Sequence, residues 1–542
     1  MSGSMSSARR AFRAAAVALG LSAAGLVQAA VPGISGTSFG LAAGAGYGSQ
    51  PDGASIYSWG YGCSPAAAAP QFVPYTPSAV GCPLWQIPGP TLVVTEGQLI
   101  TVTLTNNLPV AAGNTSIAFP GMRVTAAAPA SQPATCSNPT NPVQQGLLTL
   151  EAAPGCAVQY TMTVSNPGTY AYYSGTQPEL QIEMGLYGAL IVLPLTVPST
   201  CTALGGRLGG VTDYRLAPSA YDHPQTCYDR EYLFQFAEMS SPVHQQVDAA
   251  VNGPGACSVA PCPSLNVALE PYRPNYFLIN GRSMPDDMDP SYAPNYPNQP
   301  YNGNPHMHPN ETMLMRIIGQ GRWQHPFHFH ANHARVIARD GQLLLAANDS
   351  VSPARLAGPL LFTTPTVPGQ TQDQLFTWTG KGLNWDVYGH TPTAAAIGAG
   401  VPTGATPAGN TYGDVAPCYP DVNGYYTIAS VPPAPADAPN YGEYCADHNK
   451  PIPATPPDPQ IVSNGLWYGG TPYLGLSDTH QNHGYNSTPL PPGFASQNPG
   501  AGYAYMWHSH NEREITTNDV FPGGMMMMLI IDAPVAAIDE TL

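Results

Sequence analysis

Charged residues are scarce in this chain of 542 residues. They make up 9% of it, with 17 Lys and Arg against 33 Asp and Glu, so the formal net charge at pH 7 is −16. A surface with few basic groups and an excess of negative charge repels nucleic acids and anionic membranes. We therefore expect no nucleic-acid partner.

Long apolar runs are also lacking, apart from one near the N-terminus. Arg9, Arg10 and Arg13 precede the apolar stretch 14–27, and small residues follow it at 29–30. This pattern is typical of an export signal, and the stretch is too short and too rich in alanine to span a membrane. We expect residues 1–30 to be a signal peptide and the protein to be secreted or periplasmic, with no membrane span. Loss of the three arginines takes the formal charge from −16 to −19.

The chain has no Cys-x-x-Cys motif, which argues against a metal–thiolate site, and no cysteine lies near His508. An even number of cysteines in an exported chain indicates disulfides. Pairing of neighbours along the sequence is the simplest arrangement, although the sequence cannot establish the connectivity. The ten cysteines are Cys63, Cys82, Cys136, Cys156, Cys201, Cys227, Cys257, Cys262, Cys418 and Cys445.

Segments with helical periodicity are almost absent after the signal, whereas strand patterns are frequent. These segments are short, rich in β-branched or aromatic residues, and bounded by Gly, Pro or Asn. With 61 Pro and 56 Gly, the composition is that of a loop-rich, all-β protein. The segments are 91–106, 156–164, 186–194, 230–239 and 311–320.

An internal repeat indicates two domains of the same kind. Residues 168–192 parallel residues 502–531, so that Tyr173 aligns with His508, Ser174 with Ser509 and Gly175 with His510. We predict a first domain at 31–197 and a second whose parts are 198–390 and 500–542. A Pro/Gly/Tyr-rich insertion at 391–499 would interrupt the second domain.

Two His-x-His pairs form the strongest candidate site. His328 and His330 lie in "HPFHFH", and His508 and His510 lie in "HSHNERE". Side chains alternate along a strand, so each pair presents two imidazoles on one face and Ser509 on the other. If the two strands are neighbours, all four rings can converge on one metal. Imidazole ligands without thiolate or carboxylate favour Cu(II) or Zn, and copper binds more tightly.

Together with "YFLINGRSMPDD", "VIARDG" and "PGPTLVVTEGQLITVTLTNNL", these motifs resemble the multicopper oxidases, which are built from cupredoxin domains. The resemblance implies tandem cupredoxin-like domains, each a Greek-key β-sandwich, with copper as cofactor. It also implies a small-molecule or metal-ion substrate and raises the expectation of a homo-oligomer, a trimer.

The resemblance also implies that the blue copper site of the family is lost. His325 matches its His-Pro histidine, but Ser509 stands where the family has a cysteine, and Glu514 stands where it has the last histidine. A serine hydroxyl cannot replace the copper–sulfur bond of a thiolate. His325 and Glu514 then become candidates for metal binding or for support of the histidines.

By the same resemblance, half of the oxygen-reducing cluster is retained. His328, His330, His508 and His510 match its C-terminal ligands, whereas "AFPG" at 118–121 and "YSG" at 173–175 replace the histidines of the first domain. Four imidazoles can hold one copper well or two poorly, but not three. We predict a metal site made of these four histidines.

Other polar residues have weaker claims to a role. Glu512 and Glu514 could donate protons to the site, bind the metal or support the histidines, or they could form a solvated pair. His333 could bind the metal or support the site, or form only a local hydrogen bond. His306 and His308 in "PHMHPN" fit an exposed polar loop better than a copper-delivery site. The run Met525 to Met528 fits strand packing better than a thioether relay.

Three functions remain open at this stage. The chain is a copper oxidoreductase with a non-blue histidine site, a copper-binding protein without turnover, or a structural extracellular protein on a cupredoxin scaffold. Scattered losses would indicate relic histidines, but here one domain lost every ligand and the other kept both pairs. That asymmetry favours a retained metal site.

Overall fold

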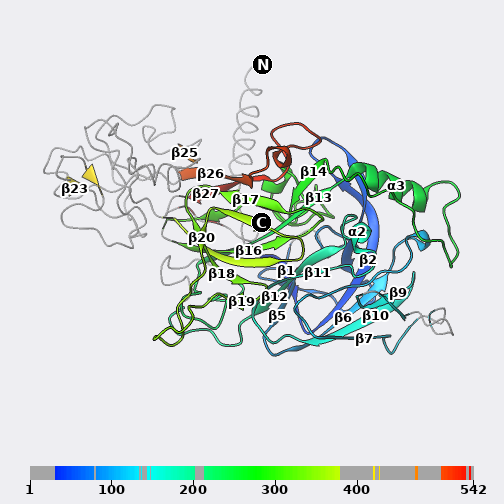
Figure 1. Cartoon of the computed structure of the whole chain (residues 1–542), viewed down its shortest axis with the longest axis horizontal. Coiled ribbons are helices and arrows are strands. Elements are labelled where there is room, and N and C mark those ends of the chain that lie inside the picture. The colour runs from blue at the N-terminus through cyan, green and yellow to red at the C-terminus, as the bar shows by residue number, and fades with distance from the viewer. Residues whose placement is uncertain are drawn as a thin grey trace, which may run out of the picture.

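The computed structural model describes most of the chain (Figure 1). The described residues are 31–77, 81–132, 136, 143–146, 148–201, 213–309, 311–378, 502–532, 536 and 538, with the strand segments 419–420, 426–427 and 470–473. The expected signal peptide and nearly all of the expected insertion, with Cys418 and Cys445, lie outside these ranges. In the described part, no helix combines the length and apolarity needed to cross a bilayer.

Residues 33–193 form two five-stranded sheets. The first has the order β11 (Gly168–Tyr173), β12 (Tyr187–Leu193), β5 (Leu92–Thr95), β1 (Gly33–Ser35) and β4 (Gln71–Val73). The second has the order β3 (Ser55–Cys63), β2 (Ser38–Ser49), β6 (Leu99–Asn106), β10 (Ala157–Thr163) and β7 (Val124–Ala127). A small pair, β8 (Val143–Gln145) and β9 (Leu150–Ala152), lies apart from them.

Residues 230–532 form a second pair of sheets. One has the order β14 (Tyr276–Ile279), β13 (Arg230–Met239), β16 (Thr312–Gly319), β22 (Thr371–Thr377), β18 (Ala334–Arg339) and β19 (Gln342–Leu343), with β20 (Leu360–Leu361) also beside β18. The other has the order β15 (His306–Met307), β27 (Met526–Asp532), β26 (Gly502–Ser509), β17 (His325–Phe329) and β21 (Thr363–Thr366), with β25 (Gly470–Tyr473) beside β26. Strands β23 (Tyr419–Pro420) and β24 (Tyr426–Thr427) pair with each other.

Each pair of sheets encloses its own apolar core, as in a β-sandwich. In the second pair, buried aromatic side chains of β13 and β22 meet those of β17 and β26, with Trp507 fully buried among Phe327, Phe329 and Phe376. Met525 and Met527 are also fully buried in this core, so the methionine run packs as a strand should. The predicted all-β class and tandem sandwich arrangement are confirmed. The domain limits remain predictions.

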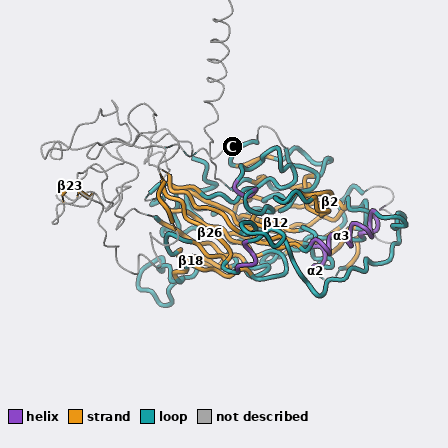
Figure 2. Tube along the Cα trace, turned by 90° about the horizontal axis from the view of Figure 1, so that it is seen from above, coloured by secondary structure: helices purple, strands orange, loops and turns teal. Residues whose placement is uncertain are grey.

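Long-range pairing creates the layer that matters for function. Figure 1 shows the red strands β26 and β27 beside the green strand β17, far away in sequence. Seen from above, the strands are drawn in orange, and the labelled helices α2 and α3 lie toward the right of the view (Figure 2).

The helices and one hairpin differ from the sequence expectation. Helix α3 (Ser241–Asn252) is an exception to the near absence of helical segments, in which Val243, Val247 and Val251 form an apolar stripe that packs on the first core. The long hairpin β2–β3 was not expected, since its sequence is rich in Gly and Ala. The short helices are α2 (Pro178–Gln181), η1 (Val110–Ala112), η4 (Asp286–Met288) and η5 (Glu512–Ile515).

Neighbour pairing of the cysteines is confirmed where the structure describes them. The four disulfides join Cys63 to Cys82, Cys136 to Cys156, Cys201 to Cys227 and Cys257 to Cys262. None of the eight described cysteines is free, so none offers a thiolate ligand to the histidines.

Candidate metal centre

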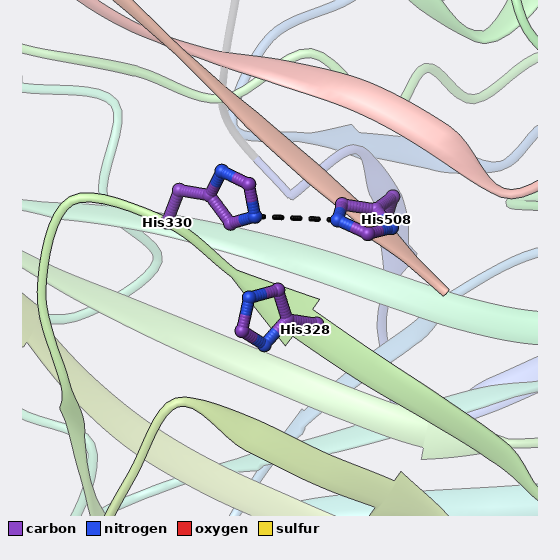
Figure 3. Close-up of side chains that lie close together, drawn as sticks. All are labelled: His328, His330 and His508. Atoms are coloured by element: carbon purple, nitrogen blue, oxygen red, sulfur yellow. Dashed lines mark hydrogen bonds between the residues drawn. The ribbon is translucent and has the colours of Figure 1, made fainter. Parts of the chain in front are cut away.

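Strands β17 and β26 bring three histidines together. The strands pair in antiparallel register, with His328 opposite His508 and Phe327 opposite Ser509. The period of two then places the imidazoles on one face of the sheet and Phe327, Phe329 and Trp507 in the core behind it. One ring nitrogen from each of His328, His330 and His508 lies within 4.8 Å of the others. Figure 3 shows the three rings facing a common space from the two strands.

The closest approach in this cluster joins His508 and His330. Their Nε2 atoms lie 3.2 Å apart, the contact that the dashed line in Figure 3 marks. The ring centroids of His328 lie 4.8 Å from His330 and 5.4 Å from His508. All three side chains are buried, between 1% and 8% exposed.

The fourth predicted ligand lies at the edge of the cluster. The ring of His510 is 4.8 Å from that of His328, and its backbone N–H donates to the carbonyl of Pro326. Unlike the other three, His510 is exposed. The structure thus places all four histidines side by side, with His510 on the solvent side of a buried group of three.

Hydrogen bonds orient two of the rings. His328 Nδ1 lies 2.7 Å from Thr363 Oγ1 on β21, and His508 Nδ1–H donates to the backbone carbonyl of Ser509 at 2.7 Å. Such bonds to the outer nitrogen fix the tautomer and ring direction of histidine ligands. They make Nε2 the nitrogen that each ring would present to a metal.

Burial and neighbouring positive charge favour the neutral form of His328 and His508. Burial, followed by the charges that His330, His508 and His510 would carry, lowers the pKa of His328 to about 3. Burial also lowers the pKa of His508. Metal binding requires neutral imidazole, so these rings are ready to act as ligands at neutral pH.

Copper fits this donor set. A tetrahedral ion with metal–nitrogen bonds of about 2.0–2.1 Å separates two ligand nitrogens by roughly 3.3 Å, which the 3.2 Å between His330 and His508 nearly matches. Three neutral imidazoles with no thiolate or carboxylate among them suit Cu(II) or Zn.

The position that corresponds to the family's blue copper holds a hydrogen-bonded chain instead. Ser509 Oγ donates to Glu514 Oε2 at 2.5 Å, and His325 Nδ1 donates to the same oxygen at 2.8 Å. His325 Nε2 donates to Glu238 Oε2 at 3.0 Å. All four side chains are almost completely buried. His325 and Glu514 are therefore bound to each other and lie behind the histidine face.

These carboxylates hold His325 as an imidazolium. Burial alone would lower the pKa of His325, but the hydrogen bonds and charges of Glu238 and Glu514 outweigh it and raise that pKa to about 9. The solvated pair considered for Glu512 and Glu514 is wrong for Glu514, which is 1% exposed, whereas Glu512 is exposed. Glu238 was missed by sequence reasoning, because nothing in the segment 230–239 links it to a histidine distant in sequence.

The remaining histidine candidates are placed as follows. His333 is half-buried, with its ring 5.0 Å from that of Phe362, which in turn lies 5.7 Å from that of His328. The exposed loop expected for His306 and His308 is wrong: both are buried in or beside β15. His306 Nδ1 lies 2.6 Å from Asp532, and His308 Nδ1 lies 3.0 Å from Glu311.

The first copy of the repeat, which lies in the first pair of sheets, has the strand pairing that the repeat alignment implies but lacks histidines at the ligand positions. Ala118 forms a β-bridge with Tyr173, as His328 pairs with His508 in the second copy. Neither Ala118 nor Tyr173 can supply an imidazole. The retained histidines are therefore confined to one of two matching positions.

Comparison with known proteins agrees with these features. Residues 85–196 match the model of the multicopper oxidase family. No match was found among curated proteins.

Several solved structures match this chain at low identity and low TM-score. The multicopper oxidase mgLAC and a blue copper oxidase from Nitrosomonas europaea are each 13% identical, with 91% of this chain and 85% of theirs covered and a TM-score of 0.41. A copper nitrite reductase from Nitrosomonas europaea is 15% identical, with 64% and 85% covered and a TM-score of 0.37. The sequence match carries more weight than these structures: residues 85–196 are similar to the multicopper oxidase family, and copper is the cofactor that this similarity implies.

Proposed function

We propose that this protein is an exported copper oxidoreductase with a single non-blue site, in which His328, His330, His508 and His510 hold the metal. The observation that carries the proposal is the convergence of three buried imidazoles from β17 and β26 on one space. Bound copper would supply one-electron chemistry between Cu(I) and Cu(II).

The residues of the chain determine how such a site would exchange electrons. In the second copy Ser509 replaces the thiolate that the resemblance would place behind the histidines, and it is bonded to Glu514. Electrons would therefore have to be exchanged at the histidine face itself. His510 is exposed there, so a small molecule or a metal ion is the class of substrate that could reach the site.

Export and a disulfide-permissive compartment belong to the same proposal. Four described disulfides favour an oxidising location, secreted or periplasmic. A homo-oligomer, as the family resemblance suggests, would be measured by light scattering of the purified protein.

A second candidate is copper binding without turnover. It is favoured by the first copy, where Ala118 and Tyr173 stand at the positions of ligands. A copper-loaded protein with a well-defined electron paramagnetic resonance spectrum, but no oxidation of phenols, aromatic amines, Fe(II) or Cu(I), would support this candidate over the oxidoreductase.

The decisive variant is His508→Ala with His510→Ala. It leaves two imidazoles, which rarely suffice against solvent competition, so tight copper binding should disappear in a chelator competition assay. His333→Ala is the matched control, because this histidine lies outside the group of three and should leave affinity unchanged. Copper binding by the double variant at parental affinity and stoichiometry would refute the site.

A further inference from the structure

One carboxylate connects the two strands that carry the histidines. Glu514 Oε2 accepts hydrogen bonds from Ser509 and from His325. Ser509 lies between His508 and His510, and His325 lies three residues before His328. We call Ser509, Glu514 and His325 the carboxylate clip. It lies on the core side of the same two strands, whose other face carries the histidine pairs.

The clip is itself anchored on both sides. Glu514 Oε1 accepts from Asn511 Nδ2 at 2.8 Å, and η5 positions both residues. At the other end, His325 Nε2 donates to Glu238, whose second oxygen accepts the backbone N–H groups of Arg322 and Trp323. The clip therefore joins β17, β26 and the segment before β17 in one buried network.

The first copy contains the same clip without charge. Ser174 Oγ and Thr115 Oγ1 both donate to Gln181 Oε1, at 2.6 and 2.8 Å. Thr115 precedes Ala118 as His325 precedes His328, Ser174 aligns with Ser509, and Gln181 comes from α2 where Glu514 comes from η5. A neutral clip is thus sufficient to hold the strand pair that has no histidines.

We propose that Glu514 and His325 are positioning residues for the copper site, and that the carboxylate clip sets the spacing between the His328–His330 and His508–His510 pairs. This inference rests on the proposed function, since it concerns the same four histidines. Charge-assisted hydrogen bonds are roughly twice as strong as neutral ones. The charged clip is therefore the stiffer of the two, and it occurs in the copy whose strand spacing must suit a metal.

The test compares a broken clip with a neutral one. Glu514→Ala leaves His325 and Ser509 without their shared acceptor, and loss of an orienting partner typically weakens metal binding about ten- to a hundred-fold. The double variant His325→Thr with Glu514→Gln rebuilds the Thr–Gln–Ser arrangement that the first copy uses. It should restore most of the affinity, because neutral hydrogen bonds in the same places, although weaker, still hold the two strands at this spacing.

Cu(II) affinity would be measured by competition with a chelator, and site geometry by the copper hyperfine splitting in electron paramagnetic resonance. We expect an altered or heterogeneous spectrum for Glu514→Ala and a parental spectrum for the double variant. Gln181→Ala is the matched control: it breaks the clip of the first copy and should leave both readouts at parental values.

The outcomes separate this inference from the proposed function. If the parent protein binds no copper, the proposed function fails. If the parent binds copper and a folded Glu514→Ala variant shows the same affinity and spectrum, the positioning role is overturned. It is also overturned if the neutral clip binds as weakly as Glu514→Ala, because charge rather than spacing would then control the site.

Discussion

Ser509 lies on the opposite face of strand β26 from the two histidines beside it in sequence. The histidines on either side of it point to the candidate metal, whereas its own hydroxyl points back to Glu514. A sulfur ligand is absent from this position, and every described cysteine is in a disulfide. Copper bound in front can therefore have imidazole ligands but no thiolate.

Copper-loaded protein should show no intense blue absorption band, because that band requires a copper–thiolate bond. Ser509→Cys alone should not produce one, since Glu514 still occupies the place of an imidazole. Ser509→Cys with Glu514→His should give a blue band in the visible spectrum, with His325 as third ligand once Glu238 releases it. A strong blue colour in the parent would contradict this account.

The protonation of His325 should appear in the pH dependence of stability. An unfolded histidine has a pKa of about 6.5. In the folded protein burial lowers the pKa of His325, but the hydrogen bonds and charges of Glu238 and Glu514 outweigh burial and raise this pKa to about 9. The folded state binds this proton more tightly, so the stabilisation is complete below about pH 6.5 and is lost as pH rises through about 9.

This loss would be measured as the free energy of unfolding in urea at a series of pH values between roughly 6 and 10, a range that includes both pKa values. Glu238 and Glu514 are hydrogen-bonded to His325, and Tyr272 links Glu238 to Glu183. The His325→Thr/Glu514→Gln variant lacks the titrating ring and should show a flatter profile. Parallel profiles for parent and variant would rule out the contribution of His325.

At the scale of elements, strand periodicity explains why half of the site was predictable. A period of two places His328 with His330 and His508 with His510 whatever the rest of the fold does. The repeat also aligned Tyr173 with His508, and the β-bridge between Ala118 and Tyr173 matches the pairing of His328 with His508. Predicted strands such as 230–239 match β13 to the residue because alternation and boundary residues are local signals.

The parts that escaped prediction depend on contacts between distant segments. Thr363 and Glu238 reach the histidines only through pairing and packing that no local pattern encodes. Helix α3 was missed because its apolar stripe is short and consists of valines, which also favour strands. His306 and His308 can be buried because their ring nitrogens form hydrogen bonds with Asp532 and Glu311, partners that the local sequence pattern did not indicate.

Strand β26 should tolerate changes on its histidine face better than on its core face. Trp507 is fully buried, and its Nε1–H donates to the carbonyl of His330 at 3.0 Å. Trp507→Ala should cost about 3–5 kcal/mol of unfolding free energy, because it leaves a large cavity. Phe521→Ala is the matched control, since Phe521 is 65% exposed. Equal stabilities of the two variants in urea would contradict the packing described here.

At the scale of the whole molecule, the two copies divide the tasks of the scaffold. The first contains two disulfides, joining Cys63 to Cys82 and Cys136 to Cys156, and neutral residues at the ligand positions. The second contains the histidine cluster and the charged clip. The Cys201–Cys227 bridge lies in the connection between them. Such a division implies that metal binding stabilises the second copy and leaves the first unaffected.

Copper removal should therefore lower the stability of one copy only. A ligand that binds the folded state stabilises it by about 2.7 kcal/mol when its free concentration is a hundred times its dissociation constant. Calorimetry with and without Cu(II) should show a shift of this order in the parent and in Gln181→Ala, whose change lies in the first copy. The His508→Ala/His510→Ala variant should show none. If copper stabilised that variant as much as the parent, the ion would be bound elsewhere, and the two strands β17 and β26 would serve the fold alone.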